Sequence, residues 1–526
     1  MPLKPLFRIK SYLFLLILAM ISPMITQAGI ERIRASWRSD PATTMVIGWD
    51  QTSGGRPVFY YGDKDHGQNW EAYEFLTPPS WANRDKNMNN VFVRLEDLKP
   101  NTVYYFIIKD SEGISKRYSF KTAPDDPSVR LSIIAGSDSR NHRMARVDAN
   151  RLVGKLRPTC VVFGGDMTAG DTGEEWTEWM DDWQLTFGSD GRVFPIIAAR
   201  GNHESSNDVL VNLFDVPNPA AFYSLTLGGD LLRIYTLNTQ IPGGGSQRDW
   251  LNRDLQANQD ITWRMAQYHQ AIRPHTAAKK ERSELILQWA TLFHKYKVKL
   301  VMESDAHVVK TTWPIRPGVG THSAEGFVRD DEHGTIYMGE GGWGAPLRAA
   351  DDPKPWTRSY GRFNQFKWIF VDEGKIEVRT IKTEGSNRVA EVTDNNIFEI
   401  PYGLVIWSPK EGDVVRIMNP NPRTDYLPSG QQAPPSPSTA GSGLVVKELD
   451  AEGKLHIEYT LTEQSNVQLI LIKEAVMQEM ARLDYPNQHT GVHQKTLELG
   501  KAPAGQYLLI VKANNKMISR FSVLIK

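Results

Sequence analysis

The stretch from residue 194 to residue 204, FPIIAARGNHE, decides the fold of the middle of this chain. An apolar run with the length of a short buried strand stops at Gly201, and polar side chains able to bind a metal ion follow at once. Four other apolar runs stop in the same way, and they lead to Asp138, Asp166, His269 and Asp305. Because open α/β sheets bind ligands at the carboxyl ends of their strands, the repeated pattern predicts an α/β domain with one site.

The candidate ligands form a set of hard and borderline donors: Asp138, Asp166, Asn202, His269, Asp305 and His307. Carboxylates, an amide oxygen and imidazoles without a thiolate suit Fe, Mn or Zn better than a soft metal. A carboxylate-rich set favours paired ions with one bridging Asp. Two such ions can clamp a phosphoryl group and generate hydroxide near neutral pH. The set therefore predicts two transition-metal ions that act on a small phosphate ester.

The order of these motifs is similar to that of a known superfamily. Asp138, Gly165-Asp166, Gly201-Asn202-His203-Glu204, His269 and Asp305-x-His307 resemble the calcineurin-like metallophosphoesterases, and so does the later segment 334–346. The resemblance covers residues 128–385 and implies a two-sheet α/β sandwich. It implies that Asp138, Asp166 and His307 hold a first metal ion, and that Asp166, Asn202, His269 and Asp305 hold a second. Asp166 would then bridge the two ions.

Three further residues are candidates for contact with substrate. The resemblance gives His203 the role of protonating the leaving oxygen or stabilising developing charge, for which the usual pKa range of histidine is suited. Arg140 and Arg200 flank two of the motifs and could hold phosphate oxygens bidentately. A surface ion pair is the alternative for each arginine.

The chain departs from the family pattern at several positions. Purple acid phosphatases carry a Tyr where Ala169 stands, and their violet colour comes from charge transfer between that tyrosinate and ferric iron. Some relatives have a His at the position of Arg140, and Asp305 replaces the first His of the family's GHxH motif. One anionic ligand is lost at the first metal and one is gained at the second, which favours a rearranged, functioning enzyme. A surface binding or adhesion protein that has lost turnover is the alternative.

Residues 29–125 are expected to form a separate β-sandwich. Runs such as 45–49, 58–61 and 104–108 are short, rich in aromatic and β-branched residues, and separated by Gly, Pro, Asn and Asp. The stretch from Leu95 to Tyr105, followed by Phe120 to Pro124, resembles a fibronectin type III domain. It is similar in particular to the domain that precedes the catalytic domain of purple acid phosphatases.

The end of the chain predicts a third domain. A connector over 386–443 ends in the Pro/Ser/Gly-rich stretch LPSGQQAPPSPSTAGSG, 427–443, and residues 444–526 contain apolar strand candidates of a small β-sandwich. The motif at 502–507 and the final residues 520–526 resemble the sorting domain of type IX secretion cargo. That resemblance implies outer-membrane secretion machinery as a partner. An ordinary accessory β-sandwich is the alternative.

Residues 1–28 predict a cleaved signal peptide, since basic residues precede an apolar run and Thr26-Gln27-Ala28 offers a cleavage site. The protein is therefore expected outside the cytoplasm: extracellular, on the cell surface or in the periplasm. The 61 Lys and Arg balance the 61 Asp and Glu, so no basic excess indicates a nucleic-acid partner. The single cysteine, Cys160, lies in an apolar run typical of a buried strand.

Two stripes of large apolar residues recur at helical spacing in the middle domain. We expect both stripes to face the core: Trp176, Trp179, Met180 and Trp183, and Leu285, Trp289, Leu292, Phe293 and Tyr296.

Overall fold

The computed structural model describes residues 27–423 and, with short gaps, 444–525. The chain divides into two compact units, residues 1–432 and 433–526. Most of the predicted signal peptide (1–26) and the predicted linker (427–443) lie outside the described residues. No helix in the described parts is long and apolar enough to cross a membrane.

The N-terminal part of the first unit is a β-sandwich, as predicted. One sheet contains, in spatial order, β4 (Phe75–Thr77), β3 (Val58–Gly62), β7 (Val103–Lys109) and β8 (Tyr118–Lys121). The other contains β1 (Ile30–Ser36), β2 (Met45–Gln51), β6 (Met88–Leu95) and β5 (Trp81–Asp85). Aromatic side chains from both sheets fill the space between them, among them the fully buried Trp49, Phe59 and Phe106.

The central part is built on two sheets that face each other. In the first, β9 (Leu131–Gly136), β10 (Cys160–Phe163) and β11 (Ile196–Ala198) run parallel. On the other side of β9 lies β21 (Gln365–Val371), antiparallel to it, and β22 (Lys375–Lys382) pairs antiparallel with β21. Two short strands pair with β22: β23 (Val405–Ile406) and β24 (Val414–Met418). The second sheet has the order β12 (Tyr223–Leu227), β13 (Leu232–Thr236), β14 (Trp263–Gln270), β15 (Leu300–Ser304), β19 (Ile336–Gly339), β16 (Val309–Thr312) and β20 (Thr357–Gly361). A separate hairpin joins β17 (Ile315–Pro317) and β18 (Phe327–Arg329).

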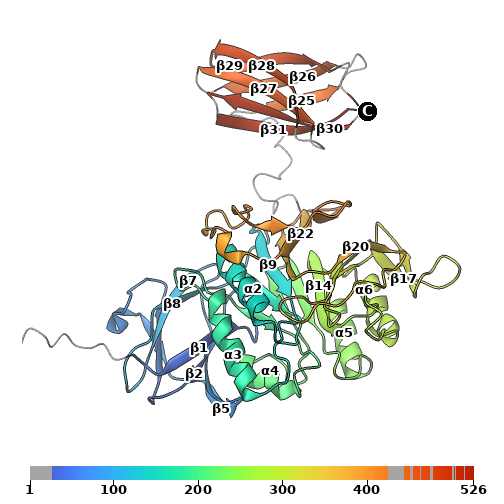
Figure 1. Cartoon of the computed structure of the whole chain (residues 1–526). Coiled ribbons are helices and arrows are strands. Elements are labelled where there is room, and N and C mark those ends of the chain that lie inside the picture. Colours follow the sequence, from blue (N-terminus) through green and yellow to red (C-terminus); the bar gives the residue numbers. More distant parts are fainter. Residues whose placement is uncertain are drawn as a thin grey trace, which may run out of the picture. The chain divides into compact units, whose positions relative to one another are not determined.

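Helices cover the outer faces of both sheets (Figure 1). The helices α2 (Arg143–Leu156), α3 (Gly173–Trp183) and α4 (Asn207–Phe214) pack with the first sheet. The second sheet is covered by α5 (Ser246–Ala257), the π-helical turn η3 (Ile286–Ala290) and α6 (Thr291–Lys295). Three short 3₁₀ turns complete this unit's described helices: η1 (Trp70–Ala72), η2 (Gln184–Thr186) and η4 (Ser386–Arg388). The result is the predicted two-sheet α/β sandwich.

Both apolar stripes face the core, as predicted. The start of α3 is fixed by a capping box, in which Thr172 and Glu175 exchange hydrogen bonds with each other's backbone N–H groups. This start turns Trp176, Trp179 and Trp183 inward, and all three are at most 1 % exposed. The second stripe is also buried, although its helix begins as a π-helical turn rather than a regular α-helix. Cys160 is fully buried in β10, and burial raises the pKa of its thiol, so it is unsuited to act as a nucleophile.

The first sheet does not stop at the edge of the central part. Ser36 of β1 pairs in parallel with Ile196 of β11, and the strands β1, β2, β6 and β5 therefore extend the central sheet. Side chains reinforce this junction. Ser36 Oγ donates a hydrogen bond of 2.7 Å to the carbonyl of Phe214, and Arg94 forms a bidentate ion pair with the buried Asp215.

The C-terminal unit is a small β-sandwich, as predicted. Its sheets have the orders β25 (Leu444–Leu449), β26 (Lys454–Leu461) and β29 (Gly491–Glu498), and β28 (Gln478–Gln488), β27 (Ser465–Lys473), β30 (Gly505–Ala513) and β31 (Lys516–Ile525). Alternate residues of these strands, such as Leu455, Leu469 and Leu509, form one buried core.

Candidate metal centre

All six predicted metal ligands meet at the carboxyl ends of β9, β10, β14 and β15 and in the loop after β11. Asp138, Asp166 and His269 offer ligand atoms that all lie within 4.8 Å of one another, so this cluster could bind a metal ion. The remaining contacts join the other three side chains to it. They are His307 Nε2 to Asp138 Oδ1 (3.2 Å), His269 Nε2 to Asn202 Oδ1 (3.2 Å) and His269 Nε2 to Asp305 Oδ1 (3.5 Å). His269 lies within β14 rather than after it.

The two histidines are oriented so that one ring nitrogen of each faces the cluster. His269 Nδ1 lies 2.9 Å from the carbonyl of Gly164, and His307 Nδ1 lies 2.8 Å from that of Pro346. A carbonyl accepts only from a protonated nitrogen, so in the neutral form of each ring Nε2 carries the lone pair that a metal ion needs.

Several buried polar atoms fit a bound cation. Asp138 Oδ1, Asp166 Oδ2 and His307 Nε2 are buried and have no hydrogen-bond partner among the described residues. A buried acceptor without a partner costs free energy, and a cation coordinated by these atoms would remove that cost. The burial and donor types of the cluster therefore match a metal site.

The backbone around the cluster is held in unusual conformations. Asp138, Asp166, Asp305 and His307 have φ angles of 58°, 56°, 70° and 55°, a left-handed region that side chains other than Gly seldom adopt. Such strain gathers at functional sites. Gly201 is required for close approach, since a Cβ there would lie 2.2 Å from Asp166 Oδ1.

Glu204 is fully buried and fixes the loops that carry two ligands. Its carboxylate accepts hydrogen bonds from three backbone N–H groups, those of Asp166 (3.1 Å), Met167 (2.8 Å) and Gly201 (2.6 Å). Burial and the negative charge of Asp166 raise the pKa of Glu204 to about 7. The last residue of the GNHE motif therefore holds the backbone of the loops that carry Asp166 and Asn202.

A second buried network supports the loop of Asp305. Lys310 Nζ donates to Glu303 Oε2 (2.6 Å), to Glu340 Oε1 (2.9 Å) and to the carbonyl of Arg273 (2.8 Å). Burial would lower the pKa of Lys310, but the two carboxylates outweigh it and raise that pKa. Glu303 and Glu340 end neighbouring strands, so the network ties the loops that follow β15 and β19. The sequence signal for it is a charged residue that interrupts or directly follows a stretch of mostly apolar residues, at Glu303, Lys310 and Glu340.

The three predicted substrate contacts have different surroundings. His203 Nδ1 bonds the carbonyl of Ala169, and its Nε2 lies 3.7 Å from Asp166 Oδ2, which directs that nitrogen toward the cluster. Arg200 is bound to its own loop, through the carbonyl of Glu204 (3.0 and 3.1 Å) and Asn207 Oδ1 (2.6 Å). Arg140 Nε is buried without a hydrogen-bond partner among the described residues. Contact of these residues with phosphate remains a prediction.

Lys279 is a residue of this site that the motifs did not indicate. Its ammonium group donates a hydrogen bond to Asp305 Oδ1. It lies in the loop after β14, where no spacing rule marks it, although a basic residue is an expected partner for the additional carboxylate at position 305.

Comparisons with known proteins agree with this fold. Residues 30–122 match the family described as the purple acid phosphatase N-terminal domain. A purple acid phosphatase structure, PPD1 from yellow lupin (Lupinus luteus) seeds, aligns over 79 % of this chain and 79 % of its own, with 17 % identity and a TM-score of 0.57. A structure of PhoD aligns over 75 % of this chain and 94 % of its own, with 12 % identity and a TM-score of 0.53. A search of curated protein sequences finds no match.

The fold and the ligand cluster together define the class: this chain has a metallophosphoesterase fold. Its architecture is, more particularly, similar to that of the purple acid phosphatases, with the matching N-terminal domain ahead of the α/β sandwich.

Proposed function

We propose that the protein is an exported, metal-dependent phosphoesterase that hydrolyses phosphate mono- or diesters at a dinuclear centre. The observation that carries the proposal is the convergence of six ligand-type side chains around buried acceptors without hydrogen-bond partners. Export rests on the N-terminal sequence pattern. A role of the C-terminal β-sandwich in contact with secretion machinery rests on its sequence resemblance alone.

The proposed ligand assignment follows the motifs. Asp138, Asp166 and His307 would hold one ion, and Asp166 with Asn202, His269 and Asp305 would hold the other. When bound, a pair of Fe, Mn or Zn ions supplies an activated hydroxide and charge stabilisation for in-line attack on phosphorus. The position that carries the tyrosinate in purple acid phosphatases is occupied here by Ala169.

Side chains of the protein would position the ligand loops and act on the leaving group. Glu204 and the Lys310 network hold the ligand loops in place, so that little reorganisation is needed when substrate binds. His203, oriented by the carbonyl of Ala169, presents Nε2 to protonate the leaving oxygen or to stabilise its charge.

The test is metal content together with activity. Purified protein should bind close to two transition-metal ions per chain and hydrolyse aryl phosphate mono- or diesters. Asp166→Asn should lose both properties, since Asp166 is the one ligand assigned to both ions. Full metal content and turnover in that variant would show that Asp166 is not the bridge. No hydrolysis of any aryl phosphate by metal-loaded wild type would refute the enzymatic function.

A further inference from the structure

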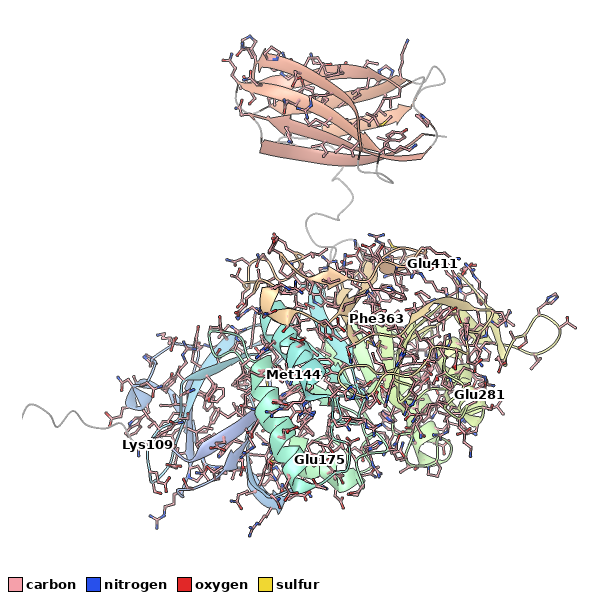
Figure 2. All side chains as sticks on the ribbon, in the orientation of Figure 1. Lys109, Met144, Glu175, Glu281, Phe363 and Glu411 are labelled. Atoms are coloured by element: carbon pink, nitrogen blue, oxygen red, sulfur yellow. The ribbon has the colours of Figure 1, made fainter. Side chains whose placement is uncertain are left out.

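The loop between β14 and η3 brings a lysine to the cluster and is firmly held. Ala277 N donates to Asp351 Oδ1 at 2.9 Å, and Glu281 forms ion pairs with Arg273 (3.3 Å) and Lys354 (3.4 Å). Glu281 is labelled in Figure 2, among the side chains of the second sheet's half of the unit. The position of Lys279 is thus set by the anchored loop around it.

Lys279 bonds the oxygen of Asp305 that faces the other ligands. Asp305 Oδ1 accepts from Lys279 Nζ and also lies 3.5 Å from His269 Nε2. The Lys279 side chain is 22 % exposed and that of Asp305 is 9 % exposed, so the lysine is the more accessible member of the pair. A small molecule that reaches the cluster from solvent would therefore meet this ammonium group.

The ammonium group has capacity for another partner. It carries three N–H donors, and Asp305 Oδ1 is its only hydrogen-bond acceptor among the described residues. A second cation lies close by, since Arg348 Nη1 donates to the carbonyl of Asp305 at 2.9 Å. Together Lys279 and Asp305 carry no net charge, like the neutral imidazole that the GHxH motif would supply at this position. The pair keeps the electrostatic balance and adds donors that an imidazole lacks.

We propose that Lys279 is a substrate-binding residue that donates hydrogen bonds to phosphate oxygens beside the Asp305 end of the centre. This inference rests on the proposed function and deepens it. Lys279 should attract an anion there and, as a like charge next to a metal position, should oppose cation binding at Asp305. Its loss therefore has two effects of opposite sign. If Lys279 had only a structural role, its loss would weaken the binding of phosphate and of the metal ion alike.

The experiment compares Lys279→Met with the matched control Lys280→Met, in which an exposed neighbouring lysine is replaced. Full-length proteins are titrated with Zn²⁺ or Mn²⁺, and the metal-loaded forms are then titrated calorimetrically with inorganic phosphate. Lys279→Met should weaken phosphate binding roughly tenfold or more, as expected for one charge-assisted hydrogen bond, and should tighten the weaker metal-binding step. Lys280→Met should change neither constant by more than about twofold. Lys279→Arg should retain most of the phosphate affinity.

Unchanged phosphate affinity in Lys279→Met, or parallel weakening of metal and phosphate binding, would overturn the inference. The two proposals fail separately. If wild type hydrolyses aryl phosphates but Lys279→Met binds phosphate normally, this inference is wrong and the proposed function stands. If wild type binds phosphate through Lys279 yet hydrolyses no ester, the proposed function is wrong and this inference stands.

Discussion

Replacement of Glu204 by Gln tests whether the buried carboxylate fixes the backbone of the ligand loops. The two side chains have nearly the same size, but Gln has one acceptor oxygen where Glu has two. Its best orientation would keep the oxygen on the side of the Asp166 and Gly201 N–H groups and would turn its NH₂ toward the N–H of Met167, which now donates at 2.8 Å. Two donors would then face each other in a fully buried position.

The cost follows from that geometry. Loss of one hydrogen bond to a charged group, with its donor left buried, costs about 1.5–3 kcal/mol of unfolding free energy. Domains of 150–250 residues lose roughly 2–4 °C of melting temperature per kcal/mol, and larger units lose less. At about 2 °C per kcal/mol, the melting temperature of this unit should fall by about 3–6 °C. Since the variant loosens the loop of Asp166, metal affinity should fall about 10- to 100-fold.

The assay is thermal unfolding and metal titration of Glu204→Gln beside Glu332→Gln. Glu332 has a side chain that is 84 % exposed, and its replacement should leave both quantities unchanged. Glu204→Asp retains both oxygens on a shorter stem and should lie between wild type and Gln. If Glu204→Gln melts at the wild-type temperature and keeps wild-type metal affinity, the three backbone hydrogen bonds do not position the site.

Three further variants test other parts of the structure. His203→Ala should lower turnover by about 10²- to 10⁴-fold with metal content unchanged; loss of metal would instead make His203 a ligand. Iron-loaded wild type should show no tyrosinate band in its visible spectrum and Ala169→Tyr should gain one, whereas a violet wild type traced to another tyrosine would overturn the ligand assignment. Lys367→Met should raise the melting temperature, by more at pH 6 than at pH 9. Burial lowers the pKa of Lys367 to about 7, so the cost of burying its charge is full below pH 7 and fades as the pH rises toward 10.5. An equal gain at both pH values would contradict a buried, titrating lysine.

The sequence predicted the parts of the site that follow a local rule. Each ligand follows or ends an apolar run, and parallel strands bring such ends to one edge, so convergence could be expected without knowledge of strand order. The burial of the aromatic stripe of α3 was predictable from another local rule, because helical spacing places these residues on one face of the helix. The structural roles of Glu204 and Lys310 could not be derived in this way. They depend on which backbone N–H groups and carboxylates lie opposite, and that is set by packing between segments far apart in the chain. Lys279 lies in a loop without periodicity, and its contact with Asp305 depends on the path of that loop.

The pairing of β1 with β11 makes the N-terminal segment part of the sheet that carries the candidate metal site, although no candidate ligand lies in that segment. The strand β11 is only three residues long and leads directly into the loop of Asn202 and His203. Without β1 beside it, this strand would become a free edge, short of hydrogen-bond partners and open to pairing with another chain. A truncated protein that begins near residue 128 would keep every ligand and still lack the neighbour that holds one ligand loop at its strand. Removal of the N-terminal segment would therefore divide the sheet that continues from β11 into β1.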